Sequence, residues 1–160
     1  MASGDGIGNW RLLLRTLRRT FDFTGRSRRT EVASYWVAVL VVTGIAEGAA
    51  TSLFSEQAGR LVRLGLTILF MLPWFALFAR RLHDHDMSGW WALLLVALFA
   101  IAVPKMLAEA FPDPRIGMVY RPSGLRTAIG FILILALLGL TLAPERIGPN
   151  RFGADPREGE

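Results

Sequence analysis

The sequence contains no cysteine, which excludes disulfide bonds, thiolate metal sites and cysteine nucleophiles. It has one lysine against 17 arginines and only two histidines, so imidazole ligands and imidazole bases are scarce. Charged residues form 19% of the 160 residues, below the share of about 25% that is usual in soluble domains. The few charges also lie between long uncharged stretches. Together these absences exclude a disulfide scaffold, a disordered chain and most ordinary soluble folds.

Hydrophobic residues, in contrast, are abundant: they form 52% of the chain, and the mean hydropathy is +0.40. A helix needs roughly 20 mainly apolar residues to cross a bilayer. Four stretches meet this requirement, at residues 32–54, 61–78, 88–111 and 127–143. The third does so only if its helix continues past Pro104, with Lys105 reaching the interface. The pattern predicts an all-α membrane protein, a bundle of four transmembrane helices whose close packing would use Gly44, Gly48, Gly65, Gly130 and Gly139.

The distribution of basic residues predicts the orientation of this bundle. Twelve of the 18 precede the first span, join the second to the third or follow the fourth, and six lie on the opposite side. Because cytoplasmic segments carry the excess of Arg and Lys, both termini are expected in the cytoplasm. Residues 1–31 would then be a cytoplasmic segment, 32–143 the membrane domain and 144–160 a cytoplasmic tail. The connection at 104–126 would be a periplasmic insertion.

The N-terminal segment carries a helical pattern of its own at residues 9–21. Its apolar residues recur at the spacing of one helix face: Trp10, Leu13, Leu14, Leu17 and Phe21. Arginines fall on the other side: Arg11, Arg15, Arg18 and Arg19. Such a basic amphipathic helix is expected to lie in the cytoplasmic headgroup layer on anionic lipid. The alternative is a helix packed on the protein's own spans. No nucleic-acid partner is expected, because topology already explains the basic residues.

Three polar clusters lie at the ends of the predicted spans. They read GRSRRTE at 25–31, RRLHDHDMSGWW at 80–91 and GPNRFGADP at 148–156. With four spans and both termini on one side, all three fall on the cytoplasmic face. We expect them to form one polar layer that contacts an anion, a lipid or a protein partner: Arg26, Arg29, Glu31, Arg80, Arg81, His83, Asp84, Asn150, Arg151 and Asp155.

The same three clusters carry a resemblance to a known family. The chain resembles the DUF805 family of small bacterial inner-membrane proteins over roughly residues 21–156. The family's elements F-x-G-R-x-x-R-x-E, R-R-L-H-D-x-G-x-S-G-W-W and G-P-N-R-F/Y-G-x-D-P are matched here in order, beginning at Phe23, Arg80 and Gly148. One departure is Asp86, which stands where the family usually has glycine. The resemblance implies a multi-pass protein of the bacterial inner (plasma) membrane, and it implies no activity because the family is uncharacterised.

Residues 83–86 suggest two chemical interpretations, a metal site and a catalytic site. His83, Asp84, His85 and Asp86 are metal-ligand types, but adjacent residues rarely converge on one ion, so no metal and no cofactor is expected. In an enzyme, His83 would act as general base and Asp84 would orient it, with a lipid headgroup as substrate. The structural alternative has Asp84 paired with a neighbouring arginine or capping the next helix, and His83 donating to a backbone carbonyl. We expect no catalytic residue here.

Two ionisable residues lie inside the predicted spans. Glu47 lies 15 residues into the first span and Arg63 the same distance from the end of the second, about 22 Å in each case. Antiparallel spans bring them level, so we expect an intramembrane ion pair between Glu47 and Arg63. A solute or proton path is the alternative.

The predicted function is that of a non-enzymatic accessory or scaffold protein. Its polar layer would bind anionic membrane lipids, a membrane protein complex or a second copy of the chain. A small oligomeric transporter or channel is the second hypothesis, and a lipid-headgroup enzyme the third.

The ion pair leads to a direct test. Glu47→Gln removes one charge of the pair, so the thermal stability of the protein in detergent is expected to fall. Unchanged thermal unfolding of the purified variant would contradict the pairing.

Overall fold

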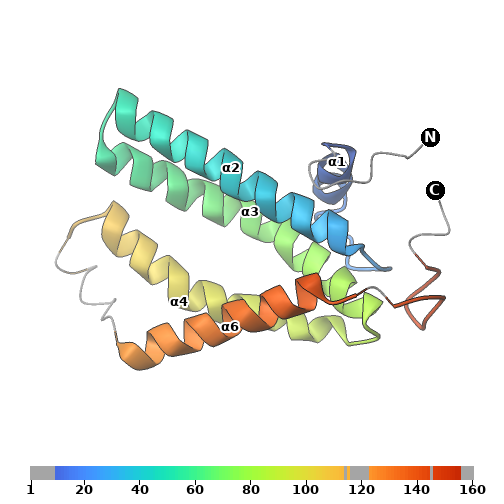
Figure 1. Cartoon of the computed structure of the whole chain (residues 1–160). Helices are drawn as coiled ribbons and strands as arrows, with labels where there is room; N and C mark the ends of the chain where they lie inside the picture. Colours follow the sequence, from blue (N-terminus) through green and yellow to red (C-terminus); the bar gives the residue numbers. More distant parts are fainter. Residues whose placement is uncertain (1–9, 114, 116–122, 145, 156–160) are drawn as a thin grey trace.

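The computed structural model describes residues 10–113, 115, 123–144 and 146–155, and all regular elements within these residues are helices, with one isolated bridge between Asn150 and Gly153. Residues 1–9, most of the 112–122 region and Pro156 of the third polar cluster lie outside the described residues. Four helices are long and apolar enough to cross a membrane. The chain is therefore an all-helical protein with four candidate membrane spans, as its sequence predicts (Figure 1).

The first two spans form an antiparallel hairpin. α2 covers Arg29–Leu53 and α3 covers Glu56–Asp84. Ser55 caps α3, because its hydroxyl accepts a hydrogen bond from the Ala58 amide at 3.1 Å. Both helices are longer than the predicted spans at 32–54 and 61–78, which counted only apolar residues. α3 continues through Arg80 and Arg81 because both side chains find buried partners.

The second pair of spans is α4 and α6. A 3-10 turn, η1 at Gly89–Ala92, leads into α4 at Leu93–Ala110, which continues through Pro104. α6 covers Gly124–Leu142, so the two helices occupy 89–110 and 124–142 where 88–111 and 127–143 were predicted. Part of the predicted insertion at 104–126 is thus helical. The two helices lie side by side below the α2–α3 hairpin in the view of Figure 1.

α3 is the central helix and contacts all the others. Its last three turns carry the core, where Phe78, Ala79 and Leu82 pack against Leu95 of α4 and Leu137 of α6. In contrast, the outer faces of the spans expose large apolar side chains, such as Leu40 at 61% and Ile45 at 68%. A bilayer covers such surface in a membrane protein. The core lies near the end of the bundle that carries residues 80–91, here called the polar end.

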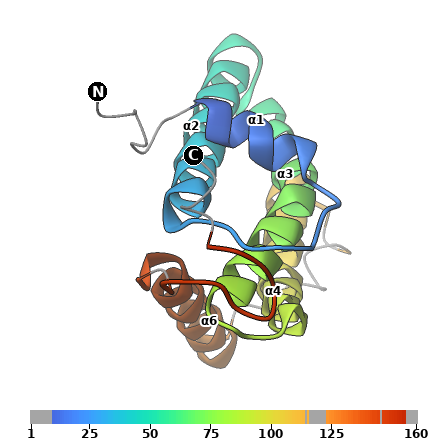
Figure 2. The same cartoon turned by 90° about the vertical axis from the view of Figure 1, so that its right-hand side faces the viewer.

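α1 covers Trp10–Arg18 and ends three residues earlier than the predicted helix at 9–21. Arg19, Thr20 and Phe21 form a turn instead, and residue 9 lies outside the described residues. α1 runs across α2 and α3 rather than along them (Figures 1 and 2). The segment 146–155 lies at the same end of the bundle (Figure 1).

One glycine permits the close approach of α2 and α3, and it is not among those predicted. A Cβ at Gly59 would lie 2.0 Å from Thr51 Oγ1 and 2.9 Å from the Glu47 carbonyl oxygen. In contrast, a Cβ at Gly44, Gly48, Gly65 or Gly139 would have no atom within 4 Å, and one at Gly130 would make an ordinary contact with Ile101. The prediction was therefore wrong for Gly44, Gly48, Gly65 and Gly139, which are exposed, whereas Gly130 is buried beside Ile101 of α4.

This difference generates a prediction. Gly59→Leu is expected to push α2 away from α3 and to lower the unfolding temperature in detergent, at a cost of about 1–3 kcal/mol for overpacking. Gly65→Leu on the same helix is the matched control, and it should leave the unfolding temperature nearly unchanged. Equal behaviour of the two variants would show that Gly59 is not a packing constraint.

Candidate functional site: the polar end of the bundle

Asp84, the last residue of α3, is fully buried between two arginines. Arg26 Nε and Nη2 donate to Asp84 Oδ1 at 2.9 and 2.7 Å, and Arg81 Nη1 donates to Oδ2 at 2.8 Å. All three side chains are at most 1% exposed. Both carboxylate oxygens are thus occupied by charge-assisted hydrogen bonds, which are stronger than neutral ones.

The remaining donors of these two arginines reach the chain after α6. Arg26 Nη1 and Nη2 donate to the carbonyl oxygens of Gly148 and Arg146, each at 2.6 Å. Arg81 donates to the carbonyl oxygens of three residues at the end of α6: Leu140, Thr141 and Ala143. The last carbonyls of a helix have no partner within it, and a cation there is favoured by the helix dipole. The pair of arginines therefore joins the start of α2, the end of α3 and the end of α6.

Arg80 makes a second buried network on another side of α3. Its Nη1 donates to the carbonyl oxygens of Arg19 and Asp22 at 3.0 and 2.7 Å, and its Nη2 lies 3.4 Å from Glu31 Oε1. Glu31 also accepts a hydrogen bond from Thr16 Oγ1 at 3.0 Å. Side chains of α1, α2 and α3 thus meet at one carboxylate, which fixes α1 to the bundle.

The turn after α1 presents its carbonyls to Arg80 because Asp22 organises it. The hydroxyl and the amide of Thr24 donate to Asp22 Oδ1 at 2.6 and 3.0 Å, and Arg19 Nε donates to Oδ2 at 2.8 Å. The hydrogen bonds from Thr24, and then the one from Arg19, hold the pKa of the Asp22 carboxyl far below its ordinary value. The carboxylate form therefore maintains this turn at neutral pH.

His83 joins the first polar cluster to the third. Its Nδ1 lies 3.1 Å from the carbonyl oxygen of Gly25, and its ring stacks on Phe152 with centroids 3.9 Å apart. Asn150 Nδ2 donates to the backbone carbonyl of His83 at 2.8 Å. Gly89 leaves room for the imidazole, because a Cβ there would lie 2.9 Å from His83 Nε2. The glycine of the S-G-W-W element therefore makes room for the His83 ring.

Asp86, which stands where the family usually has glycine, adopts a backbone conformation that glycine favours. Its φ is +61°, in the left-handed region that glycine adopts readily and that aspartate tolerates better than most residues. Its carboxylate pairs with Arg151 at 3.1 Å and Arg146 at 3.2 Å, on exposed side chains. The substitution therefore adds ion pairs at the surface of the turn.

The other predicted layer residues lie around this centre. Asp155 is buried and accepts a hydrogen bond from the Gly148 amide at 2.9 Å, where Gly148 has a φ of +84°. The Arg151 guanidinium lies over the Phe152 ring, 4.7 Å from its centroid. Arg29 begins α2 and its side chain is exposed. The structure thus brings Arg26, Glu31, Arg80, Arg81, Asp84 and Asp155 together inside the polar end, with His83, Asn150 and Arg151 beside them.

A separate cluster of charges lies at the opposite end of the bundle. Arg63 Nη1 lies 3.4 Å from Glu47 Oε1, and Arg63 Nη2 lies 2.5 Å from Glu109 Oε2. Lys105 also pairs with Glu109, at 3.0 Å. Sequence reasoning missed Glu109, although it lies one helical turn beyond Lys105. Because Arg63 has two carboxylate partners, Glu47→Gln removes only the longer of its two pairs.

The geometry supports neither the metal site nor the general-base site suggested by residues 83–86. Asp84 directs its carboxylate to Arg26 and Arg81, so it does not orient His83 as the aspartate of a general-base pair would. Among the described residues, no group of three His, Asp or Glu side chains is arranged to hold a metal ion. Arg26, Arg80 and Arg81 are buried and already donate to oxygen atoms of the protein. Asp84 with Arg26 and Arg81 has a structural arrangement, here called the buried clasp.

Comparisons with known proteins agree with this architecture. The family model DUF805, described as a protein of unknown function, matches residues 20–154. The chain is 31% identical to the inner membrane protein YhaH of Escherichia coli K12, over 90% of this chain and 94% of YhaH. It is 38% identical to the inner membrane protein YhaI of the same organism, over 91% of this chain and 95% of YhaI. No solved structure matches the chain significantly.

The buried clasp generates a prediction. Asp84→Asn leaves Arg26 and Arg81 buried without a counter-charge, so it is expected to lower the free energy of unfolding by about 3–5 kcal/mol. Asp86→Asn makes the same chemical change two residues away on an exposed ion pair, where the expected loss is about 0–1 kcal/mol. Denaturant unfolding in detergent measures both. Similar losses for the two variants would contradict a special role for Asp84.

Proposed function

The chain belongs to the DUF805 family of membrane proteins, whose function is unknown, and we propose that it is a non-enzymatic accessory protein that holds a basic helix on anionic lipid. In this proposal the polar end and both termini face the cytoplasm of a bacterium. The proposed orientation is supported by the excess of arginine at this end, with twelve of the 18 basic residues in the segments that lead to it.

The observation that carries the proposal is the position of α1. Its inner side packs on the bundle through Leu13 and the fully buried Thr16. Leu14 and Leu17 on the adjacent side are 40% and 46% exposed, and Phe21 just beyond the helix is 80% exposed. Because α1 lies across the spans, it is parallel to the plane of a bilayer that the bundle crosses (Figure 2). The exposed apolar side is then available to the acyl region.

The arginines of α1 occupy a third side. At 100° per residue, Arg11, Arg15 and Arg18 fall together, away from the apolar residues, and all three are exposed. A helix with this distribution lies in the headgroup layer, where each arginine contributes about 1 kcal/mol of attraction to an anionic surface. We therefore assign lipid contact to these arginines and to the exposed Arg29 and Arg151.

The buried residues of the polar layer have a different role in the proposal. Arg26, Arg80 and Arg81 have their guanidinium groups inside the protein, so they position α1 and the C-terminal segment and do not contact lipid. This division changes the first expectation, in which all ten residues of the layer contact a ligand. The enzyme hypothesis receives no support from the geometry, because Asp84 does not orient His83. The transporter hypothesis receives no support from α3, which is apolar from Leu64 to Ala79 apart from Thr67.

The proposal is tested by the protection of the α1 backbone amides in lipid nanodiscs. Hydrogen exchange at residues 10–18 is expected to be slower in phosphatidylglycerol than in phosphatidylcholine. Replacing Arg11, Arg15 and Arg18 with Gln should remove this difference, which corresponds to about 3 kcal/mol in opening free energy for three arginines. The matched control replaces with Gln three arginines that the predicted topology places on the opposite side, Arg115, Arg121 and Arg126. The difference in exchange between the two lipids should remain in this variant. Equal exchange of wild-type α1 in the two lipids would refute the proposal.

A further inference from the structure

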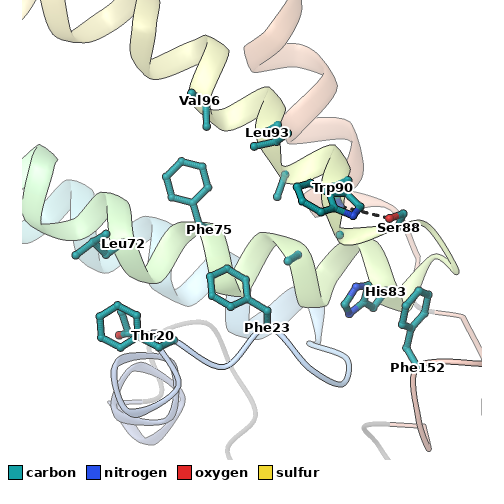
Figure 3. A pocket seen from close by; sticks show the side chains of 14 residues that line it. Thr20, Phe23, Leu72, Phe75, His83, Ser88, Trp90, Leu93, Val96 and Phe152 are labelled. Atoms are coloured by element: carbon teal, nitrogen blue, oxygen red, sulfur yellow. Dashed lines mark hydrogen bonds between the residues drawn. The ribbon is translucent and has the colours of Figure 1, made fainter.

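An apolar groove of about 660 Å³ runs along α3 at the polar end. Residues 72–83 of α3 form one wall, and residues 88–96 of η1 and α4 form the other. The turn after α1 borders it through Phe21 and Phe23 (Figure 3). Lining side chains on both walls are exposed, with Leu72 at 46%, Leu93 at 56% and Val96 at 47%, so a membrane lipid can enter the groove laterally.

The length of the groove matches one leaflet of a bilayer. Eleven residues separate Leu72 from His83, which corresponds to about 16 Å along a helix. The hydrocarbon core of a membrane is about 30 Å thick, so one leaflet contributes about 15 Å. Because His83 lies at the polar end, the groove extends from that end along α3 toward the middle of the bundle.

The lining changes in polarity along this length. Leu72, Phe75 and Val96 lie toward the deep end, with Thr20 as the labelled polar residue there, whereas His83 and Ser88 lie at the shallow end (Figure 3). An acyl chain attached to a polar headgroup has the same distribution. A concave apolar site also contacts a chain on several sides, unlike the convex outer faces of the helices.

The shallow end is positively charged. Phe152 lines the groove and stacks on His83, and the Arg151 guanidinium lies 4.7 Å from the centroid of its ring. Arg146 and Arg151 share the single carboxylate of Asp86, which leaves one net positive charge. Their side chains are 56% and 61% exposed, so a lipid phosphate can reach them.

We propose that this groove binds one anionic phospholipid, with an acyl chain between α3 and α4 and its phosphate beside Arg151. The site goes beyond the proposed function, because α1 contacts the lipid surface whereas the groove selects a single molecule. It depends on the chain crossing a bilayer and not on which end faces the cytoplasm.

Photo-crosslinking in nanodiscs tests the site. The probe is phosphatidylglycerol with a diazirine near the end of one acyl chain, and phosphatidylcholine with the same chain is the comparison. Crosslinks are expected on residues 72–79 and 93–96, about fivefold more with phosphatidylglycerol for one additional charge contact. An even distribution of crosslinks over the outer faces of all four spans would overturn the proposal, because it is the pattern of bulk lipid.

A pair of variants supplies the matched control. Val96→Trp fills the groove, whereas Val42→Trp makes the same change on the outer face of α2, and the two valines are 47% and 46% exposed. Val96→Trp is expected to abolish the groove crosslinks and Val42→Trp to retain them. Leu72→Trp fills the groove from the other wall and replaces Val96→Trp if that variant is not monodisperse. Retention of the crosslinks in a monodisperse groove-filled variant would also overturn the proposal.

The headgroup end has its own variant. Arg151→Gln is expected to reduce crosslinking by phosphatidylglycerol to the level of phosphatidylcholine, while crosslinks from both lipids remain in the groove. An unchanged preference would overturn the assignment of the phosphate to Arg151. Replacing the three α1 arginines with Gln should leave groove crosslinking intact, so failure of the groove proposal and failure of the proposed function are separately visible.

Discussion

The polar end of the bundle depends on one buried carboxylate. Asp84 ends α3 and receives hydrogen bonds from Arg26, which precedes α2, and from Arg81, one turn earlier in its own helix. Two guanidinium groups in an apolar interior are stable only when a counter-charge and further acceptors are present. Here the carboxylate supplies the charge, and the carbonyls after α6 supply the acceptors. Residues from three distant parts of the sequence are thereby fixed together.

The adjacent arginines of α3, Arg80 and Arg81, bind different parts of the molecule. Successive residues of a helix point about 100° apart, so Arg81 reaches α6 while Arg80 reaches α1 and α2 through Glu31. Arg80 in this way determines that α1 lies across the spans instead of extending from them. The proposed contact of α1 with anionic lipid and the groove beside it both follow from this placement.

Much of the fold follows from the sequence because a bilayer imposes a simple length requirement. Four apolar stretches predict four helices, and residues 80–81 extend the second of them because their charges are neutralised inside the protein. The charged cluster at the opposite end was only half predictable. Glu47 and Arg63 are level in antiparallel helices, but Glu109 joins them only because α4 packs beside α3 and brings its carboxylate to Arg63. Gly59 was missed for a similar reason, since its role in helix packing depends on its contact with Thr51 of the facing helix.

The sequence by itself determined the class of protein, the number of spans and the family, because hydrophobic length and short motifs are local properties of the chain. Only the tertiary structure decided which charged residues are interior and which are surface. Arg26 and Arg29 are alike in sequence, yet the first is 4% exposed on Asp84 and the second is exposed at the start of α2. Arg26 is buried because Asp84, 58 residues away, accepts two hydrogen bonds from its guanidinium group. Such pairing depends on helix rotation and packing, which no local pattern specifies.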